Sequence, residues 1–158
     1  MAIVQKRKIV ISASRRTDIP AFYMDWFMQH ITQGYFEVVN PFNNTLFSVS
    51  ASPDSVHTIV FWSKNFGPFI ANDYIKKLQD KGYNLFFNFT INSEDYYLEP
   101  QVPSLKERLK QLETLCRRVA PRSVQWRFDP IAVWTSGGKR FDNLGGFTAI
   151  SERMAKIG

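Results

Sequence analysis

The chain has 158 residues, of which 44% are hydrophobic and 15% aromatic, and its formal net charge at pH 7 is +6. This length and composition indicate one globular domain with a sizeable core over residues 1–158 and exclude a disordered chain. The excess of positive charge favours an anionic partner, such as a phosphorylated small molecule or a nucleic acid. Because the basic residues are scattered and form no block, the charge alone does not decide between these partners.

A single cysteine, Cys116, excludes an intrachain disulfide and gives no sign of secretion. No apolar run approaches the roughly 18 residues that a transmembrane helix needs. The start of the chain carries its charges before a very short apolar run, which makes it a poor signal peptide. We therefore expect a cytoplasmic protein.

Short apolar or alternating segments take turns with amphipathic helical segments along the chain. The expected strands cover 9–13, 35–39, 58–62, 84–91 and 124–128, with a short return strand at 46–51. The expected helices cover 20–33, 68–81, 105–119 and, with a weaker pattern, 141–157. This alternation predicts an α/β fold with about five main strands in a mostly parallel sheet, either an open sheet or part of a (β/α) barrel.

The clearest helix start in the chain follows Ser104, because Glu107 stands three residues later and completes a capping box. Two segments are expected as loops. One is the polar, aromatic stretch 92–103, which is long enough to suggest a functional role, and the other is 131–138.

Polar side chains follow the expected strands at the ends where α/β proteins bind ligands. These residues are Ser14, Arg15, Arg16, Thr17 and Asp18 after the first strand, Asn40 after the second, Trp62, Ser63, Lys64 and Asn65 around the end of the third, Asn88 and Thr90 within the fourth, and Arg127 and Asp129 around the end of the fifth. In a parallel sheet these ends share one edge, so we expect most of these side chains to line one pocket.

The cations of this set are suited to hold a phosphate or carboxylate group, since the arginine fork binds such groups through two hydrogen bonds. They are Arg15, Arg16, Lys64 and Arg127, and Ser14, Asn65 and Asn88 would add neutral contacts to the substrate. Asp18 and Asp129 are the candidate catalytic residues, which would orient the cations or transfer protons.

Structural roles compete with these functional ones. Asp18 or Thr17 can simply cap the first helix. One of Arg15 and Arg16 can serve as the ion-pair partner of an aspartate, and Asn65 can merely begin a turn.

Arg127 and Asp129 have the stronger functional case, because a charged face within an apolar strand is costly without a partner or a ligand. His30 and Cys116 lie on apolar helix faces and are interpreted as core residues, and His57 precedes a strand at the end opposite the pocket. Two distant histidines and one cysteine provide neither zinc-ligand spacing nor a nucleophile–base pair.

Several of these motifs together closely resemble a bacterial family of uncharacterised proteins, domain of unknown function 1848. The motifs are SASRRTDIPAFY at 12–23, the Asn40-Pro41-Phe42 step, FWSKN at 61–65, Asn88-Phe89-Thr90 and WRFDP at 126–130. The resemblance covers nearly the whole chain.

The resemblance implies a (β/α)-barrel-type enzyme with an iron–sulfur cluster. Members of the family are typically about twice this length, and their second half ends in a cysteine cluster similar to that of radical S-adenosylmethionine enzymes. This chain departs from that pattern, because it stops at Gly158 and has only Cys116. We therefore expect it to be a fragment or a truncated gene product that cannot ligate a four-iron cluster.

These expectations lead to one leading hypothesis: the N-terminal part of a barrel-type iron–sulfur enzyme with an anion-binding pocket at the strand ends. Half a barrel leaves open sheet edges, so we expect self-association. One rival is a basic nucleic-acid-binding module, favoured by the net charge of +6, four tryptophans and six tyrosines. Another is a half-domain that completes its fold with a second chain.

Overall fold

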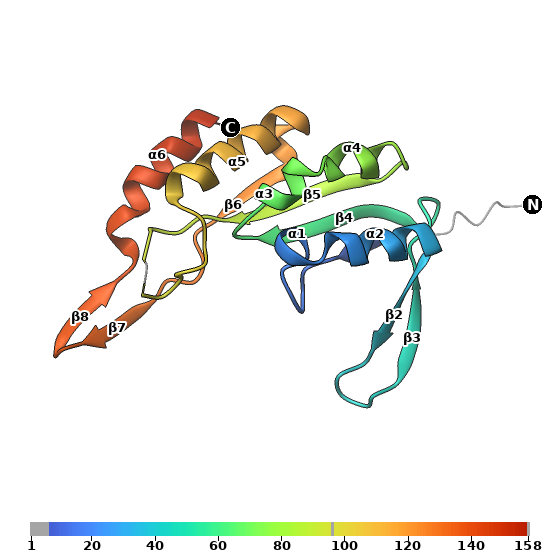
Figure 1. Cartoon of the computed structure of the whole chain (residues 1–158), viewed down its shortest axis with the longest axis horizontal. Coiled ribbons are helices and arrows are strands. Elements are labelled where there is room, and N and C mark those ends of the chain that lie inside the picture. Colours follow the sequence, from blue (N-terminus) through green and yellow to red (C-terminus); the bar gives the residue numbers. More distant parts are fainter. Residues whose placement is uncertain (1–6, 96, 158) are drawn as a thin grey trace, which may run out of the picture.

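The computed structural model describes residues 7–95 and 97–157 of the chain (Figure 1). Its main sheet has four parallel strands in the spatial order β1–β4–β5–β6. The strands are β1 (Ile9–Ser12), β4 (Val56–Ser63), β5 (Asn84–Thr90) and β6 (Val124–Arg127). The predicted α/β fold with a parallel sheet is confirmed, and a closed barrel is not observed.

Two β-hairpins lie outside the main sheet and project from the same side of the molecule in Figure 1. The first pairs β2 (Tyr35–Val39) with β3 (Leu46–Ser50) in an antiparallel manner. The expectation that 35–39 joins the main sheet is therefore wrong, and the sheet has one strand fewer than predicted. The tight connection explains the antiparallel pairing with β3: Asn40 Oδ1 accepts a hydrogen bond from the Phe42 backbone and Asn44 adopts a left-handed φ of 54°.

The second hairpin pairs β7 (Val133–Ser136) with β8 (Lys139–Asp142). Gly137 and Gly138 form its two-residue turn with φ angles of 56° and 74°, which suit the twist of a hairpin. The prediction that residues 131–138 form a loop is therefore wrong, because they contain β7 and the turn of this hairpin. The last helix, α6 (Phe147–Ile157), begins six residues later than expected.

Two of the predicted helices are interrupted. The first is divided at Tyr23 into α1 (Ile19–Phe22) and α2 (Met24–Gln33), because Tyr23 leaves the helical conformation with φ −130° and ψ 24°. The second is divided by Asp73, which has a left-handed φ of 55°, into α3 (Gly67–Ala71) and α4 (Tyr74–Gln79).

The helix that follows the loop 92–103 begins where its capping box predicts. It is α5 (Leu105–Arg118), and Ser104 and Glu107 make both hydrogen bonds of the predicted capping box. Short 3₁₀ turns, Pro121–Ser123 and Leu144–Gly146, precede β6 and α6. No helix within the described residues is long and apolar enough to cross a membrane.

The two faces of the main sheet differ in character. Each step from β1 to β6 moves in the same direction across the sheet, so right-handed crossovers place the connecting helices on one face. Apolar side chains that point to that face, such as Ile59, Phe61, Phe87 and Phe89, are fully buried in the core.

The register of the strands places a more polar set of side chains on the opposite face, which we call the open face. Its members are Thr58, Val60 and Trp62 from β4, Phe86, Asn88 and Thr90 from β5, and Gln125 and Arg127 from β6. Trp62 remains 38% exposed there. The open face and the carboxyl edge of the strands are where the predicted site residues converge.

Candidate site at the carboxyl edge of the sheet

Asp18 connects the first helix to the end of β4. One carboxylate oxygen accepts a hydrogen bond from the Ala21 backbone at 3.1 Å and caps α1, and the other accepts one from Ser63 Oγ at 2.8 Å. Burial raises the pKa of the Asp18 carboxyl above its ordinary value of 3.8, and the hydrogen bonds from Ser63 and Ala21 oppose that rise. The structural role that competed with a catalytic one is therefore present in the fold.

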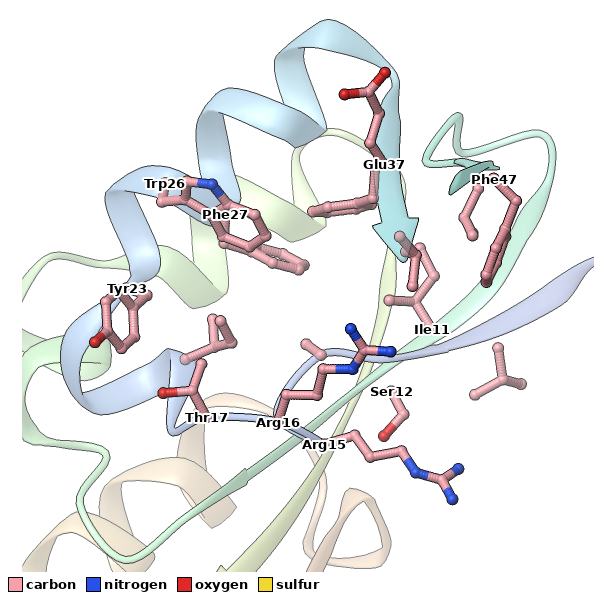
Figure 2. A pocket seen from close by; sticks show the side chains of 16 residues that line it. Ile11, Ser12, Arg15, Arg16, Thr17, Tyr23, Trp26, Phe27, Glu37 and Phe47 are labelled. Carbon is pink, nitrogen blue, oxygen red and sulfur yellow. The ribbon is translucent and has the colours of Figure 1, made fainter. Parts of the chain in front are cut away.

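Arg15 and Arg16 line a cavity of about 690 Å³ bordered by β1, α2 and the β2–β3 hairpin (Figure 2). Arg16 Nη2 donates a hydrogen bond to the Val39 carbonyl at 2.7 Å. Arg15 forms no hydrogen bond or ion pair with other described residues. Neither Lys64 nor Arg127 lines this cavity.

Arg127 is the best-positioned cation of the open face. Its guanidinium carbon lies 4.5 Å from the centre of the Trp62 ring, and its Nη2 donates to Asp129 Oδ2 at 2.7 Å. The side chains of Arg127 and Asp129 are 30% and 55% exposed, so a ligand can reach both. The indole and the Asp129 carboxylate hold the guanidinium from two sides. Its other nitrogens have no partner in the described part of the chain.

Lys64, directly after β4, lies close enough to Asp129 to feel its charge. It forms an ion pair with Glu99 from the long loop. Burial and the charge of Arg108 lower the pKa of Lys64, whereas the charge of Asp129 raises it. We call Lys64 and Arg127, together with Trp62 and Asp129, the cationic cluster.

Of the neutral residues predicted to bind substrate, Asn88 lies on the open face beside the cationic cluster. In the sheet it is the neighbour of Trp62 on one side and Gln125 on the other. The residue is only 5% exposed, and its side chain makes no hydrogen bond with other described residues. An amide with unused donors and acceptors therefore stands next to the Arg127–Trp62 stack.

The other two neutral residues serve the fold. Asn65 Oδ1 accepts hydrogen bonds from the Gly67 backbone and from Gln111 Nε2, which ties the end of β4 to α5. Ser14 Oγ accepts one from the Trp62 backbone at 3.2 Å and joins β1 to β4.

Two asparagines that the sequence analysis missed hold the segment that carries Asp129. Asn92 is 2% exposed; its Oδ1 accepts from the Asp129 backbone at 2.8 Å and its Nδ2 donates to the Asp129 carbonyl at 3.1 Å. Asn143 Nδ2 donates to the Pro130 carbonyl at 2.8 Å. The signal available in the sequence is that Asn92, a polar residue, directly follows the expected strand 84–91.

Arg108 was also missed, because its position on the apolar face of α5 is unexpected for a charged residue. It is 2% exposed, and its Nε donates to the Pro103 carbonyl at 2.9 Å. Its Nη1 has no partner among the described residues. Burial lowers the pKa of Arg108, and the charge of Glu94 opposes that effect.

Comparison with known families agrees with the motifs around this site. Residues 10–157 match the family described as Domain of unknown function (DUF1848). The chain belongs to the DUF1848 family. The match confirms the membership predicted from the motifs, and no curated protein or solved structure matches this DUF1848 chain.

The residues of this DUF1848 chain do not fit an iron–sulfur cluster. Cys116 is half-buried on α5, and burial raises the pKa of its thiol, which opposes the thiolate that a metal requires. His30 is stacked on Phe36 and packs at a tilt against Trp26. Within the described residues, no three His, Cys, Asp or Glu side chains are grouped so as to hold a metal ion.

Proposed function

We propose that this DUF1848 chain binds an anionic small molecule, a carboxylate or a phosphate, on the open face at the carboxyl ends of β4, β5 and β6. The observation that carries the proposal is the Arg127 guanidinium, which is stacked on Trp62 and engaged by Asp129 through one nitrogen only. The remaining N–H groups have no partner among the described residues, and the side chain is 30% exposed, which favours binding of a carboxylate or phosphate anion.

The neighbours of Arg127 complete the proposed anion site. Lys64, which is paired with Glu99, adds an ammonium group, and the buried amide of Asn88 can donate one hydrogen bond. Asp129 keeps Arg127 in place and is exposed enough to accept a proton from a bound ligand. Asp18, which is engaged by Ala21 and Ser63, would act on this site only by fixing the position of β4.

A redox reaction of the type that the family resemblance implies would need a cluster supplied from outside this chain. No step of the present proposal depends on that cluster. The chain's own contribution is to bind and orient the anion against the sheet.

The proposal can be tested by titrating the chain with inorganic phosphate and with citrate while backbone amide signals are recorded by NMR. We expect the signals of Trp62, Asn88 and Arg127 to shift, and Arg127→Gln to weaken binding by about tenfold or more, since a charged hydrogen bond contributes about 1.5–3 kcal/mol. Arg118→Gln is the matched control, because it removes the same charge from an exposed ion pair with Asp73.

Equal losses in Arg127→Gln and Arg118→Gln would mean that phosphate responds only to net charge, and the proposed site would be abandoned. The nucleic-acid alternative predicts a different pattern. A single-stranded oligonucleotide would bind with strong salt dependence, and replacing the exposed Lys77 and Lys81, but not Arg127, would weaken it.

A further inference from the structure

The outer edge of β1 carries backbone groups that no described residue satisfies. β1 is the end strand of the main sheet. The backbone N–H of Ile9 donates a hydrogen bond to the Ser55 carbonyl, and that of Ala13, directly after β1, donates one to the Val60 carbonyl. Successive residues of a strand direct their backbone groups to opposite sides, so the N–H and C=O of Val10 and Ser12 point away from β4. The side chain of Val10 is 60% exposed, which leaves this edge accessible.

An apolar groove runs along this same edge. The cavity of about 690 Å³ is lined by the four consecutive residues Val10 to Ala13 on one side. Its other walls come from α2 and the β2–β3 hairpin, which contribute aromatic and branched side chains (Figure 2). They include Trp26, Phe27, Phe36, Phe47 and Val49.

The charges at the groove favour an acidic occupant. Arg15 and Arg16, which follow β1, belong to its lining, and Arg15 has no ion-pair partner among the described residues. Glu37 is the one carboxylate in the lining.

We propose that the β1 edge binds an extended, apolar segment of another protein, which adds a strand to the sheet and places acidic side chains beside Arg15 and Arg16. Such a segment satisfies the outward N–H and C=O groups of Val10 and Ser12 through main-chain hydrogen bonds. Its alternate side chains enter the groove against α2 and the hairpin, and its carboxylates neutralise the two arginines. This interaction is separate from the anion site on the open face.

A second copy of this chain fits the edge less well. Antiparallel pairing of two β1 strands would place Arg7 and Lys8 of each copy beside Arg15 and Arg16 of the other. Like charges placed together across a strand pair are destabilising. The charges therefore favour a partner with an acidic segment over self-association through β1.

The test uses an eight-residue peptide of alternating threonine and valine that ends in two glutamates, titrated into the full chain and followed by NMR. We expect the amide signals of Val10 and Ser12 to shift and their hydrogen exchange to slow. The same peptide with two lysines in place of the glutamates is expected to bind about tenfold more weakly or worse, because each lost charge pair costs affinity.

Two variants distinguish strand addition from non-specific binding of the peptide. Val10→Pro removes an outward N–H while keeping the hydrogen bonds to β4, as proline is tolerated at a free strand edge, and it should weaken binding of the acidic peptide about tenfold. Arg15→Glu should also weaken that peptide and should strengthen the lysine peptide. Arg122→Glu, at an exposed position on another part of the chain, should change the affinity for neither the glutamate peptide nor the lysine peptide.

Three results would overturn the proposal. The first is the absence of any change at Val10 and Ser12 with up to about 1 mM peptide, the weak limit of a specific complex. The second is undiminished binding to a Val10→Pro protein whose circular dichroism is native. The third is a dimer that forms with rising protein concentration and protects the same amides, since the occupant would then be a second copy. If Val10→Pro does not fold, the exchange of charges with Arg15→Glu decides alone.

Discussion

At the scale of single residues, Asp18 shows how one carboxylate can connect two elements. It accepts one hydrogen bond from the start of α1 and one from Ser63 at the end of β4. Asp18→Ala removes both acceptors, and we expect the free energy of unfolding to fall by about 2 kcal/mol, as for a lost helix cap that also leaves a hydroxyl unpaired. Urea denaturation measures the change. Asp18→Asn is the control, since it retains one oxygen and should lose less.

The same residue gives a prediction for pH. The pKa of Asp18 in the folded protein lies above its ordinary value of 3.8, because burial disfavours the charged form. As pH rises from about 3.8 through the folded pKa, the unfolded chain releases this proton first, so the charge costs stability over that interval. The free energy of unfolding of the native chain relative to Asp18→Asn should therefore decrease with rising pH across this window. An increase would show that the hydrogen bonds from Ser63 and Ala21 outweigh burial.

At the scale of elements, the position of Asp129 depends on Asn92 at the end of β5. Asn92→Ala removes two hydrogen bonds that hold the Asp129 backbone. We expect a loss of about 2 kcal/mol in the free energy of unfolding, because each bond contributes about 1 kcal/mol and the freed groups are partly buried. Phosphate should bind more weakly as well, since Arg127 loses its fixed partner.

The binding result separates a positioning role from a purely structural one. Asn72→Ala is the matched control, since Asn72 is exposed and donates only to the Pro68 carbonyl of its own helix. It should leave phosphate affinity unchanged. Normal phosphate affinity in a folded Asn92→Ala protein would show that Asp129 holds Arg127 without help from β5.

The elements also differ in how far sequence predicts them. The start of α5 follows from Ser104 and Glu107, because a capping box acts within four residues. Which sheet 35–39 joins does not follow from the sequence, since an alternating apolar strand is compatible with the main sheet and with a separate hairpin. The Gly137–Gly138 turn is a local hairpin signal, but each flanking strand has only four residues, too few for a clear alternating pattern.

At the scale of the whole molecule, the site could be predicted only as far as the sheet order follows from the alternation of strands and helices. Arg127 and Asp129 are paired and Lys64 and Asn88 lie near them, because β4, β5 and β6 are neighbours. Arg15 and Arg16 lie elsewhere, because the β2–β3 hairpin leaves the main sheet and forms the far wall of a groove beside β1. The return strand expected at 46–51 indicates the hairpin itself, but no local pattern shows that the hairpin lies outside the main sheet.

Cys116 allows a prediction for the chain as a whole. Anaerobic incubation of the purified chain with iron and sulfide should yield no stoichiometric cluster, because one half-buried thiol cannot replace the four thiolates of a four-iron site. Visible absorbance and iron content after desalting measure the outcome. A chain that retains about four irons per molecule would contradict the ligand set described above.

The pairing of β1 with β4 has a consequence for biosynthesis. Ile9 is paired with Val56, so β1 leaves the ribosome 47 residues before its partner begins to appear. At about 5–20 residues per second, an apolar strand waits for roughly 2–10 s with both of its edges unpaired. β4 and β5 are closer in the chain, with Thr58 paired to Asn84. The nascent chain therefore depends on keeping its first strand free of wrong partners until β4 emerges, and the basic residues that flank β1 provide mutual repulsion between neighbouring nascent chains.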